Sequence, residues 1–541
     1  MNSIKYTIVS VLTTIILSTS CTLDRNPLDE FAENDFWTSE ENALLAMTGI
    51  YKAKINWGVE YNPSDWWSYG GLVLLELASD NGYDRRGVNS NFHKMTDGTL
   101  LANNSFVKNY WDNSYAKIAR CNRFLEGIDQ LSTSQNVVDR FKAEARFIRA
   151  TQYFYLSQYF QDVPLILKTL NKDEANVVEK NSKEEIITFL IKEFTEAAQD
   201  LPRFKDLTNA EEGRACKQAS LAFLGRTLLA EKKFSDAASI YEQIISLGDN
   251  IIDPDYASIF LPSNENSAEN IFSMQYLEDL AGNGMPQHAY PVKDGGWCLI
   301  NCTANLFEAY LFTDGTPFSY SSPLYDPNSL GKNRDPRLDY TIYYNGATFR
   351  GSQYDCHPDS KSPDKIAGGQ TTQTGFMIRK YFDESFNGNI NSYGGNIPII
   401  RYAEILLSYI EAKLEAGEAI NQSLLDATIN QLRTRTSVNM PIVTETNPDK
   451  LREIIRNERQ VEFGMEGLRY WDLLRWGIAH EKLNGDVYGA PFPGAIRNSP
   501  NAEGILDPQG RWYVTTRKFR KDQDYKWPIP QSEQDINPNL R

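Results

Sequence analysis

Residues 215–247 read ACKQASLAFLGRTLLAEKKFSDAASIYEQIISL, and the spacing within this stretch decides the fold class. Counted from Leu224, the chain places Leu228 four positions on, Ala237 thirteen positions on and Tyr241 seventeen positions on. This order of apolar, small and aromatic residues predicts two antiparallel helices packed face to face. One such pair cannot bury its own apolar surface, so it needs further helix pairs beside it.

The stretch resembles a tetratricopeptide repeat, a two-helix module that stacks into arrays. Helical spacing recurs elsewhere, and the candidate partner helices lie at residues 110–160, 183–232, 402–435 and 450–483. Near the start of the chain, Ser39 precedes two glutamates, which is typical of a helix N-terminus. The sequence therefore predicts a mainly α fold, a tetratricopeptide-like helix-pair scaffold that carries a long loop-rich insertion.

The insertion is recognised by a change in residue composition. Residues 253–400 are rich in Gly, Asn, Asp, Pro and aromatic residues and have no sustained helical spacing, and the tail after Gly485 is similar. The many aromatic residues argue against disorder. We predict a single body at 37–541, in which the scaffold covers about 37–252 and 401–485 and the loop-rich part covers about 253–400 and 486–541.

The composition is that of a soluble globular protein and excludes several function classes. The 541 residues include 55 Lys and Arg against 71 Asp and Glu, which gives a formal net charge of −16, and the mean hydropathy is −0.48. Such an acidic chain is a poor nucleic-acid binder. Aromatic residues make up 12% of the chain, and many lie among turn formers, which suggests exposed stacking surfaces.

The N-terminus predicts export. Residues 1–20 have a polar start with Lys5 and a short apolar segment, too short to span a bilayer, followed by small residues directly before Cys21. This arrangement is similar to a lipoprotein signal peptide, after which Cys21 is acylated and residues 21–36 form a tether. The alternative is an ordinary secretory signal with an incidental cysteine.

The other cysteines do not form a zinc-binding pattern. Cys121, Cys216, Cys298, Cys302 and Cys356 lack paired CxxC spacing, so buried or incidental thiols are favoured over a metal cluster that would use His357. The sequence predicts no cofactor and no metal site, and no spacing argues for a structural calcium.

The densest charge pattern runs from Arg452 to Arg475. Glu458, Glu462 and Glu466 recur at intervals of four, which places neighbouring carboxylates about 6 Å apart on a helix, within the range of a glycosidase pair. Arginines are interleaved throughout, however, and positive neighbours lower a carboxylate pKa, whereas a general acid needs a raised one. We therefore predict a structural ion-pair network here.

Several blocks together resemble the SusD/RagB family, in the family's order along nearly the whole mature chain. The blocks are Phe36-Trp37, AEARFIR at 143–149 leading to YFQDVPL at 159–165, GRA at 213–215, RYAEILL at 401–407, LRTR at 432–435, RNER at 456–459 with Glu462, GLRYWDL at 467–473 with Arg475-Trp476, PIPQSE at 528–533 and NPN at 537–539. One departure is Gln161, where the family commonly has glycine.

The resemblance implies a surface-exposed, lipid-anchored outer-membrane protein without catalytic activity. Such a protein binds oligosaccharide or polysaccharide and delivers it to a SusC-like TonB-dependent transporter, as part of polysaccharide utilisation. The helical half would meet the transporter and the loop-rich half would carry the ligand site. Some members of the family bind ligands other than glycans, so the resemblance does not settle the ligand.

Aromatic loops supply the candidate ligand-binding residues, because sugar rings stack on aromatic faces while their hydroxyls need polar partners at the edge. The first loop offers two adjacent tryptophans, the next offers polar edges, and a third places a tryptophan after two glycines, where it should project. The candidates are Trp66, Trp67, Tyr69, Asn81, Arg85, Asn89, Tyr290, Trp297 and Tyr354. Two alternatives remain at this point, an exported glycoside hydrolase on a helical scaffold and a helical-repeat adaptor whose ligand is another protein.

Overall fold

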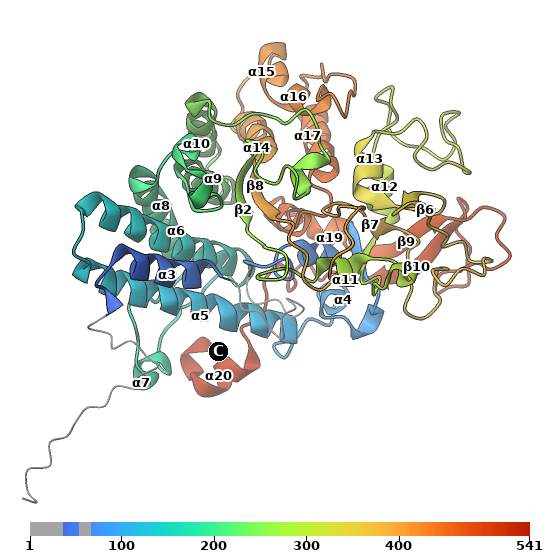
Figure 1. The fold of residues 1–541 in the computed structure, drawn as a ribbon. Helices are drawn as coiled ribbons and strands as arrows, with labels where there is room; N and C mark the ends of the chain where they lie inside the picture. The colour runs from blue at the N-terminus through green and yellow to red at the C-terminus, as the bar shows by residue number, and fades with distance from the viewer. Residues whose placement is uncertain (1–35, 53–65) are drawn as a thin grey trace, which may run out of the picture.

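The computed structural model describes residues 36–52 and 66–541, so the predicted signal peptide, Cys21 and most of the tether lie outside the described residues. Long helices form one side of the molecule and short strands with long connections form the other (Figure 1). The mainly helical prediction is confirmed. The long helices are α3 (Glu40–Tyr51), α5 (Ser105–Gly127), α6 (Gln135–Tyr159), α8 (Lys183–Asp200), α9 (Lys217–Ala230), α10 (Phe234–Leu247), α14 (Tyr402–Glu415) and α17 (Pro448–Glu462).

These helices pack as a continuous array in which each element contacts the next. The order of contacts runs from α5 to α6, α8, α9, α10, α14 and α17, and α3 lies against α5 and α6. Local signals set several helix ends: Ser39 accepts a hydrogen bond from the Asn42 amide to cap α3, and α8 begins with a capping box between Ser182 and Glu185. The α6 helix ends before Gln161, which adopts φ 67°, a left-handed conformation that glycine adopts more easily.

The helix pair predicted from residues 215–247 is confirmed as α9 and α10. Ala237 and Tyr241 are buried between the two helices. Gly225 of α9 lies directly under the Tyr241 ring of α10, because a Cβ placed on it would lie 2.6 Å from a ring carbon of Tyr241. The absence of a side chain at Gly225 therefore leaves the space that the aromatic residue of the second helix fills.

Short helices connect and cover the array. They are α4 (Asn91–Lys94), α7 (Lys172–Ala175), α11 (Met285–Ala289), α12 (Ala304–Ala309), α13 (Arg337–Thr341), α15 (Gln422–Ala427), α16 (Ile429–Arg433), α18 (Arg469–Arg475), α19 (Ala479–Lys482) and α20 (Gln531–Ile536). The C-terminal α20 returns below α5 (Figure 1). It is held there by the Gln531 amide, which donates to the Ala102 carbonyl.

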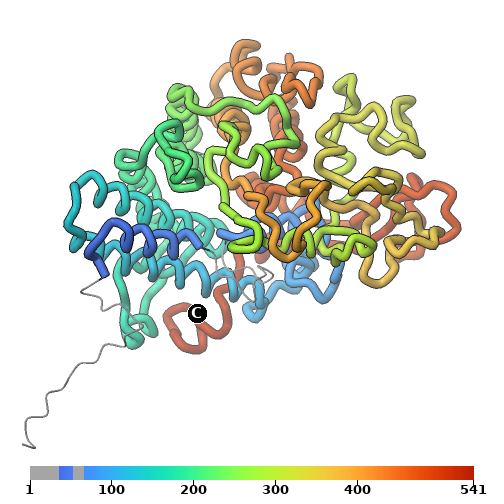
Figure 2. The backbone as a smooth tube through the Cα atoms, viewed as in Figure 1, coloured from blue at the N-terminus to red at the C-terminus, as the bar shows by residue number. Residues whose placement is uncertain are grey.

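The strands are short and antiparallel, and the largest sheet has the order β1-β3-β7-β4. Its strands are β1 (Gly82–Asp84), β3 (Ile300–Cys302), β7 (Met377–Ile378) and β4 (Ile342–Tyr343). Three two-stranded sheets accompany it, made of β2 (Asn270–Met274) with β8 (Ile397–Arg401), β5 (Thr348–Phe349) with β6 (Ser352–Gln353), and β9 (Gly485–Pro491) with β10 (Arg511–Arg517). The segment from 253 to 400 winds across these sheets with long connections (Figure 2).

One element departs from the proposed division of the chain. Residues 82–84 were assigned to the helical scaffold, but β1 pairs with β3 of the loop-rich part, in the register Gly82 to Cys302 and Asp84 to Ile300. Two residues so far apart in sequence cannot be paired by a local pattern. The largest sheet therefore contains strands from both the helical scaffold and the loop-rich part of the chain.

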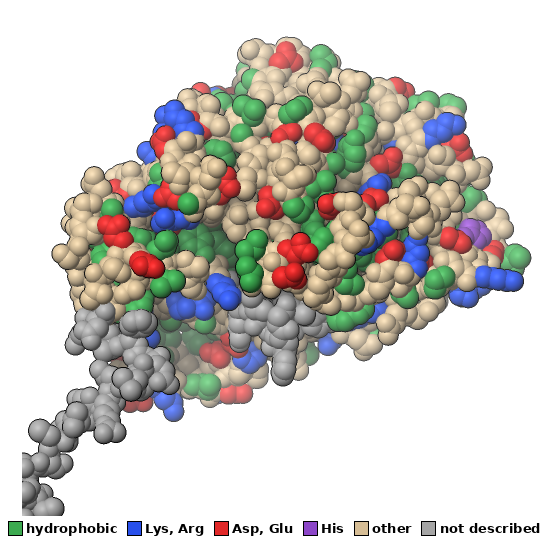
Figure 3. All heavy atoms as spheres, viewed as in Figure 1, with side chains coloured by type: hydrophobic (Ala, Val, Ile, Leu, Met, Phe, Trp, Pro, Cys, Tyr) green, Lys and Arg blue, Asp and Glu red, His purple; other side chains and the backbone are tan. Residues whose placement is uncertain are grey.

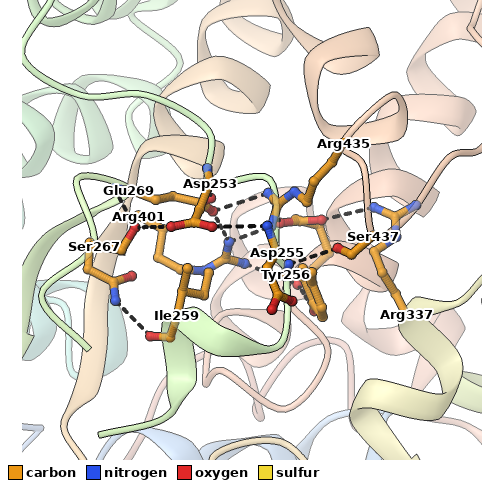
Figure 4. A network of polar contacts seen from close by, with 12 residues as sticks. Asp253, Asp255, Tyr256, Ile259, Ser267, Glu269, Arg337, Arg401, Arg435 and Ser437 are labelled. Atoms are coloured by element: carbon orange, nitrogen blue, oxygen red, sulfur yellow. Dashed lines mark hydrogen bonds and ion pairs between the residues drawn. The ribbon is translucent and has the colours of Figure 1, made fainter. Parts of the chain in front are cut away.

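A buried network of charged side chains lies where the helical array meets the loop-rich part (Figure 4). The Arg401 guanidinium bonds Glu269, Glu462 and Glu466 at 2.6 to 2.9 Å. Arg337 and Arg435 reach Glu462 at 2.9 and 3.2 Å. The predicted ion-pair network is thus confirmed, and it extends to arginines outside the 452–475 block.

The electrostatics of Glu462 follow from this arrangement. Burial alone would raise the pKa of Glu462, but the guanidiniums of Arg435, Arg401 and Arg337 outweigh burial and hold that pKa well below its usual range. Glu462 is therefore ionised throughout the physiological range, which suits a structural carboxylate and not a general acid.

Gly225→Ala should lower the free energy of unfolding by about 1–3 kcal/mol, because the new methyl group overlaps the Tyr241 ring. The measurement is chemical denaturation followed by far-UV circular dichroism. Gly49→Ala on α3 is the matched control, since a Cβ there meets no atom within 4 Å, and it should be neutral or stabilise by up to about 1 kcal/mol. Equal effects of the two substitutions would contradict the packing argument.

Glu462→Gln should destabilise the protein by about 3–5 kcal/mol, because it leaves three buried guanidiniums short of one carboxylate. The control is Glu453→Gln on the same helix, where the side chain is 74% exposed and pairs only with Arg456 at 3.6 Å; it should cost less than about 1 kcal/mol.

The same pair of variants makes a prediction about pH. Because the pKa of Glu462 is lower in the folded protein than in the unfolded chain, its contribution is fully present above about pH 4.3 and declines as the pH falls further. The difference in unfolding free energy between the natural protein and Glu462→Gln should therefore narrow between pH 5 and pH 3. A difference that stays constant over this range would show that the charge of Glu462 is not what stabilises the fold.

Candidate functional site

Trp297 projects from a tight turn between the short helical segment η7 (Val292–Asp294) and strand β3. Gly295 adopts φ 83°, and a Cβ on Gly296 would lie 2.1 Å from the Tyr290 carbonyl oxygen, so the turn requires both glycines. The chain then runs back along α11, and the Trp297 amide donates to the Gln287 carbonyl at 2.8 Å. Trp297 is left 40% exposed on the surface.

A buried histidine supports the Trp297 ring from behind. The ring centroids of His288 and Trp297 are 5.2 Å apart, and the Tyr69 hydroxyl lies 2.7 Å from His288 Nδ1. Burial lowers the pKa of His288 to about 3, and the positive charge of Arg86 acts in the same direction. The imidazole is therefore neutral. Tyr69 lies behind the surface and holds the His288 ring, on which the Trp297 ring rests.

Two arginines follow directly on β1, beside the same turn, and Asn89 comes three residues later. The Arg85 amide donates to the Leu299 carbonyl at 3.1 Å, which places the end of β1 two residues from Trp297. The Arg85 guanidinium reaches the Gly369 carbonyl at 3.4 Å. Arg86 is oriented by Asp84, and Asn89 is exposed. An exposed indole with guanidinium and amide groups nearby can stack on a flat apolar ring face and bond hydroxyls at its edge.

The adjacent tryptophans lie inside the helical array, which differs from the expectation that they stack on a ligand. Trp66 is fully buried, with Tyr155 at 4.8 Å and Phe223 at 5.8 Å between ring centroids. Trp67 is 4% exposed and carries the Lys117 ammonium 4.8 Å from its ring centroid. Aromatic neighbours from α6 and α9 cover Trp66, and Tyr51 of α3 and Phe272 of β2 pack against Trp67, so neither indole offers a flat face to a sugar.

Three further candidates are also buried. Asn81 donates to Glu76 and accepts from Gln460, which uses its amide for internal bonds. Tyr290 packs against Phe349 and Phe382 at 5.2 and 5.1 Å, and the Tyr354 hydroxyl lies 3.2 Å from the Met377 sulfur. Of the nine candidates, the structure brings Arg85 beside the Trp297 turn with Tyr69 behind it, leaves Asn89 exposed elsewhere on the same connection, and places the other five in the core.

Sequence reasoning missed His288 as part of this site. The chain has four histidines, and His288 precedes Trp297 by nine positions. No local spacing indicates that the chain reverses at Gly295 and Gly296 and brings the two rings together. The candidates did not include Arg86 either, whose guanidinium is oriented by Asp84 at the end of β1.

The glutamates that favoured an enzymatic alternative are not accessible. Glu458, Glu462 and Glu466 are all buried and paired, with Arg337, Arg401 and Lys380 among their partners. A substrate cannot reach this set in the described structure. Figure 3 shows acidic and basic side chains mixed over the face that it draws, without a large area of one sign.

The cysteines and the described helices place further limits on the chemistry. The five cysteines at 121, 216, 298, 302 and 356 are buried thiols, and burial raises the pKa of Cys216 and of Cys298 to about 12. Within residues 36–52 and 66–541, no three potential ligand side chains of His, Cys, Asp or Glu gather as a metal site. No helix in the same ranges combines the length and the apolar composition that crossing a bilayer would take.

Comparison with known proteins places the chain in a family. Residues 259–541 match the model described as "SusD family", and residues 73–229 match one described as "Starch-binding associating with outer membrane". A SusD-like carbohydrate-binding protein from Bacteroides fragilis is 53% identical, with a TM-score of 0.91 over 94% of this chain and 100% of that chain.

More distant relatives share the fold over nearly the full length. The SusD-like protein P2 from Formosa agariphila is 22% identical over 99% of this chain and 98% of its own. Surface glycan-binding protein A from Bacteroides thetaiotaomicron, solved with laminarihexaose, is 21% identical with a TM-score of 0.67 over 93% of this chain and 99% of that chain. On the extent of the family match and the 53% identity, the chain belongs to the SusD family.

Proposed function

We propose that this protein binds a glycan at the surface around Trp297 and does not cleave it. The observation that carries the proposal is the exposed indole of Trp297, supported by His288 and with Arg85 beside its turn. A relative of 53% identity is described as carbohydrate binding, which supports a glycan as the ligand class.

We further propose that the protein is lipid-anchored at Cys21 on the outer membrane and passes its ligand to a SusC-like TonB-dependent transporter. The small residues before Cys21 support acylation. The match described as "Starch-binding associating with outer membrane" supports the location. The transporter rests on the family resemblance alone, and co-purification of the two proteins from membranes would test it.

Trp297→Ala should weaken oligosaccharide binding at least tenfold, which corresponds to about 1.4 kcal/mol. The ring supplies the stacking surface, and because it is 40% exposed its loss should leave the melting temperature unchanged. Isothermal titration calorimetry with the best ligand from a glycan panel measures the affinity, and scanning fluorimetry measures the melting temperature.

Two controls separate stacking from general surface effects. Trp297→Phe keeps an aromatic face and should retain more affinity than Trp297→Ala. Ile496→Ala removes another exposed apolar side chain, 88% exposed, and should leave binding unchanged. Unchanged affinity in Trp297→Ala would remove Trp297 from the site.

The absence of cleavage is tested by release of reducing ends. The natural protein should release none from a polysaccharide that it binds, over hours at micromolar protein. Asp294 is the carboxylate to test as a control, because it lies three residues before Trp297 and burial raises its pKa. Release by the natural protein that Asp294→Asn abolishes would contradict the binding-only proposal and identify a hydrolase.

A further inference from the structure

Two adjoining hollows lie beyond the other end of β3, next to the β9–β10 hairpin. The first, of about 690 Å³, is lined by Phe318, Tyr320, Tyr325 and three prolines. The second, of about 260 Å³, is lined by Asn305, Asp486, Tyr488, Arg511 and Arg517 among others. Glu308 lines both hollows, so the two adjoin, and together we call them the hairpin groove.

The aromatic walls of the hairpin groove are half-buried and held in place. Tyr320 lies edge to face with Phe318 and with Tyr325, at 4.8 and 5.2 Å between ring centroids. The Arg511 guanidinium lies 4.4 Å from the Tyr488 ring centroid. Each ring is therefore fixed by its neighbours while part of its surface lines the hollow, which is the condition for a preorganised stacking surface.

A chain of hydrogen bonds joins the two hollows. The Tyr320 hydroxyl donates to Glu308 at 2.9 Å, and Arg511 donates to the same carboxylate oxygen at 3.0 Å. Arg511 also pairs with Asp507 at 2.8 Å. Because the acidic and basic groups at this junction are already paired with one another, the groove offers hydrogen-bonding groups without a strong net charge.

Arg517 forms part of the wall of the second hollow. It is 4% exposed and lines the second hollow, and its terminal nitrogens donate to the carbonyls of Ser79 and Gly82 at 2.5 and 2.7 Å. Its Nε has no hydrogen-bond partner among the described residues. Burial lowers the pKa of Arg517 to about 10. The two hydrogen bonds fix the Arg517 guanidinium in the wall of the second hollow, where it adds to the preorganised lining.

We propose that the hairpin groove is a second binding site for a neutral oligosaccharide, distinct from the surface around Trp297. Its tyrosine faces would stack on sugar rings, while Asn305, Glu308 and Arg511 would bond hydroxyls. The inference rests on the proposed function for the class of ligand. Paired charges at the junction favour a neutral glycan over an acidic one.

The sheet fixes the spacing between the two sites. Trp297 precedes β3 by three residues and Asn305 follows it by three. A fully extended chain of this length spans at most about 28 Å, so the Cα atoms of the two residues are no further apart. A polysaccharide longer than this could occupy both sites, and the second contact would raise the apparent affinity through effective concentration.

The test uses Trp297→Ala as the background. This single variant should still be retarded by polysaccharide in a native affinity gel, and adding Tyr488→Ala should weaken the remaining binding at least tenfold. Tyr513→Ala is the matched control, because it lies on the same hairpin, 6.2 Å from Tyr488 between ring centroids, and outside the lining of the groove. In the Trp297→Ala background it should change binding less than twofold, and melting temperatures exclude unfolding.

The outcomes separate this inference from the proposed function. If the natural protein binds a glycan and Trp297→Ala abolishes all binding, the second site is overturned and the proposed function stands. If adding Tyr488→Ala or Tyr513→Ala reduced glycan affinity equally, the second site would also be overturned. Binding of a proline-rich peptide to the groove in place of the glycan would overturn it as well. If the natural protein binds no glycan of the panel, both proposals fail.

Discussion

Burial of the Arg401 guanidinium is the constraint on which the described fold depends. A guanidinium removed from water costs several kcal/mol unless carboxylates compensate it, and here they come from separate segments, Glu269 before β2 and Glu462 at the end of α17. If any of these segments moved away, the Arg401 guanidinium would lose a carboxylate partner and stay buried with its charge uncompensated. The long connections of the loop-rich part are therefore fixed on the helical array at points where few regular elements hold them (Figure 4).

The charged segment from Arg452 to Arg475, which supplies Glu462 to Arg401, also positions the surfaces proposed to bind ligand. Arg469 pairs with both oxygens of Asp80 at 2.8 and 2.9 Å, and the amides of Gly467 and Arg469 donate to Glu76. These bonds hold the segment that leads into β1. Since β1 pairs with β3, one end of the strand pair presents Arg85 beside the Trp297 turn, and the other presents Asp80 beside Asn305. The geometry of both proposed binding surfaces thus depends on buried ion pairs.

The sequence was sufficient for the helical half of the fold because its signals are local. The spacing from Leu224 to Tyr241 and the cap at Ser39 each act within one or two helices, and arginines interleaved with glutamates on α17 indicate pairing without identifying the partners. The strands had no such signal. β1 and β3 have three residues each and are paired across more than two hundred positions, so only the tertiary arrangement specifies them.

The aromatic candidates show why a site is harder to predict than a fold. Trp66 and Trp297 both lie among turn-forming residues, and composition alone gives them equal standing. What separates them is whether another segment supplies neighbours for both faces of the ring: α6 and α9 do so for Trp66, whereas Trp297 rests on His288 and remains partly exposed. The two glycines before Trp297 were informative because they impose a local conformation, a turn sharp enough to carry the next side chain outward. A residue pattern therefore predicts that a side chain is exposed only where the pattern fixes the backbone conformation. Elsewhere, the neighbours that other segments supply determine whether the side chain is buried.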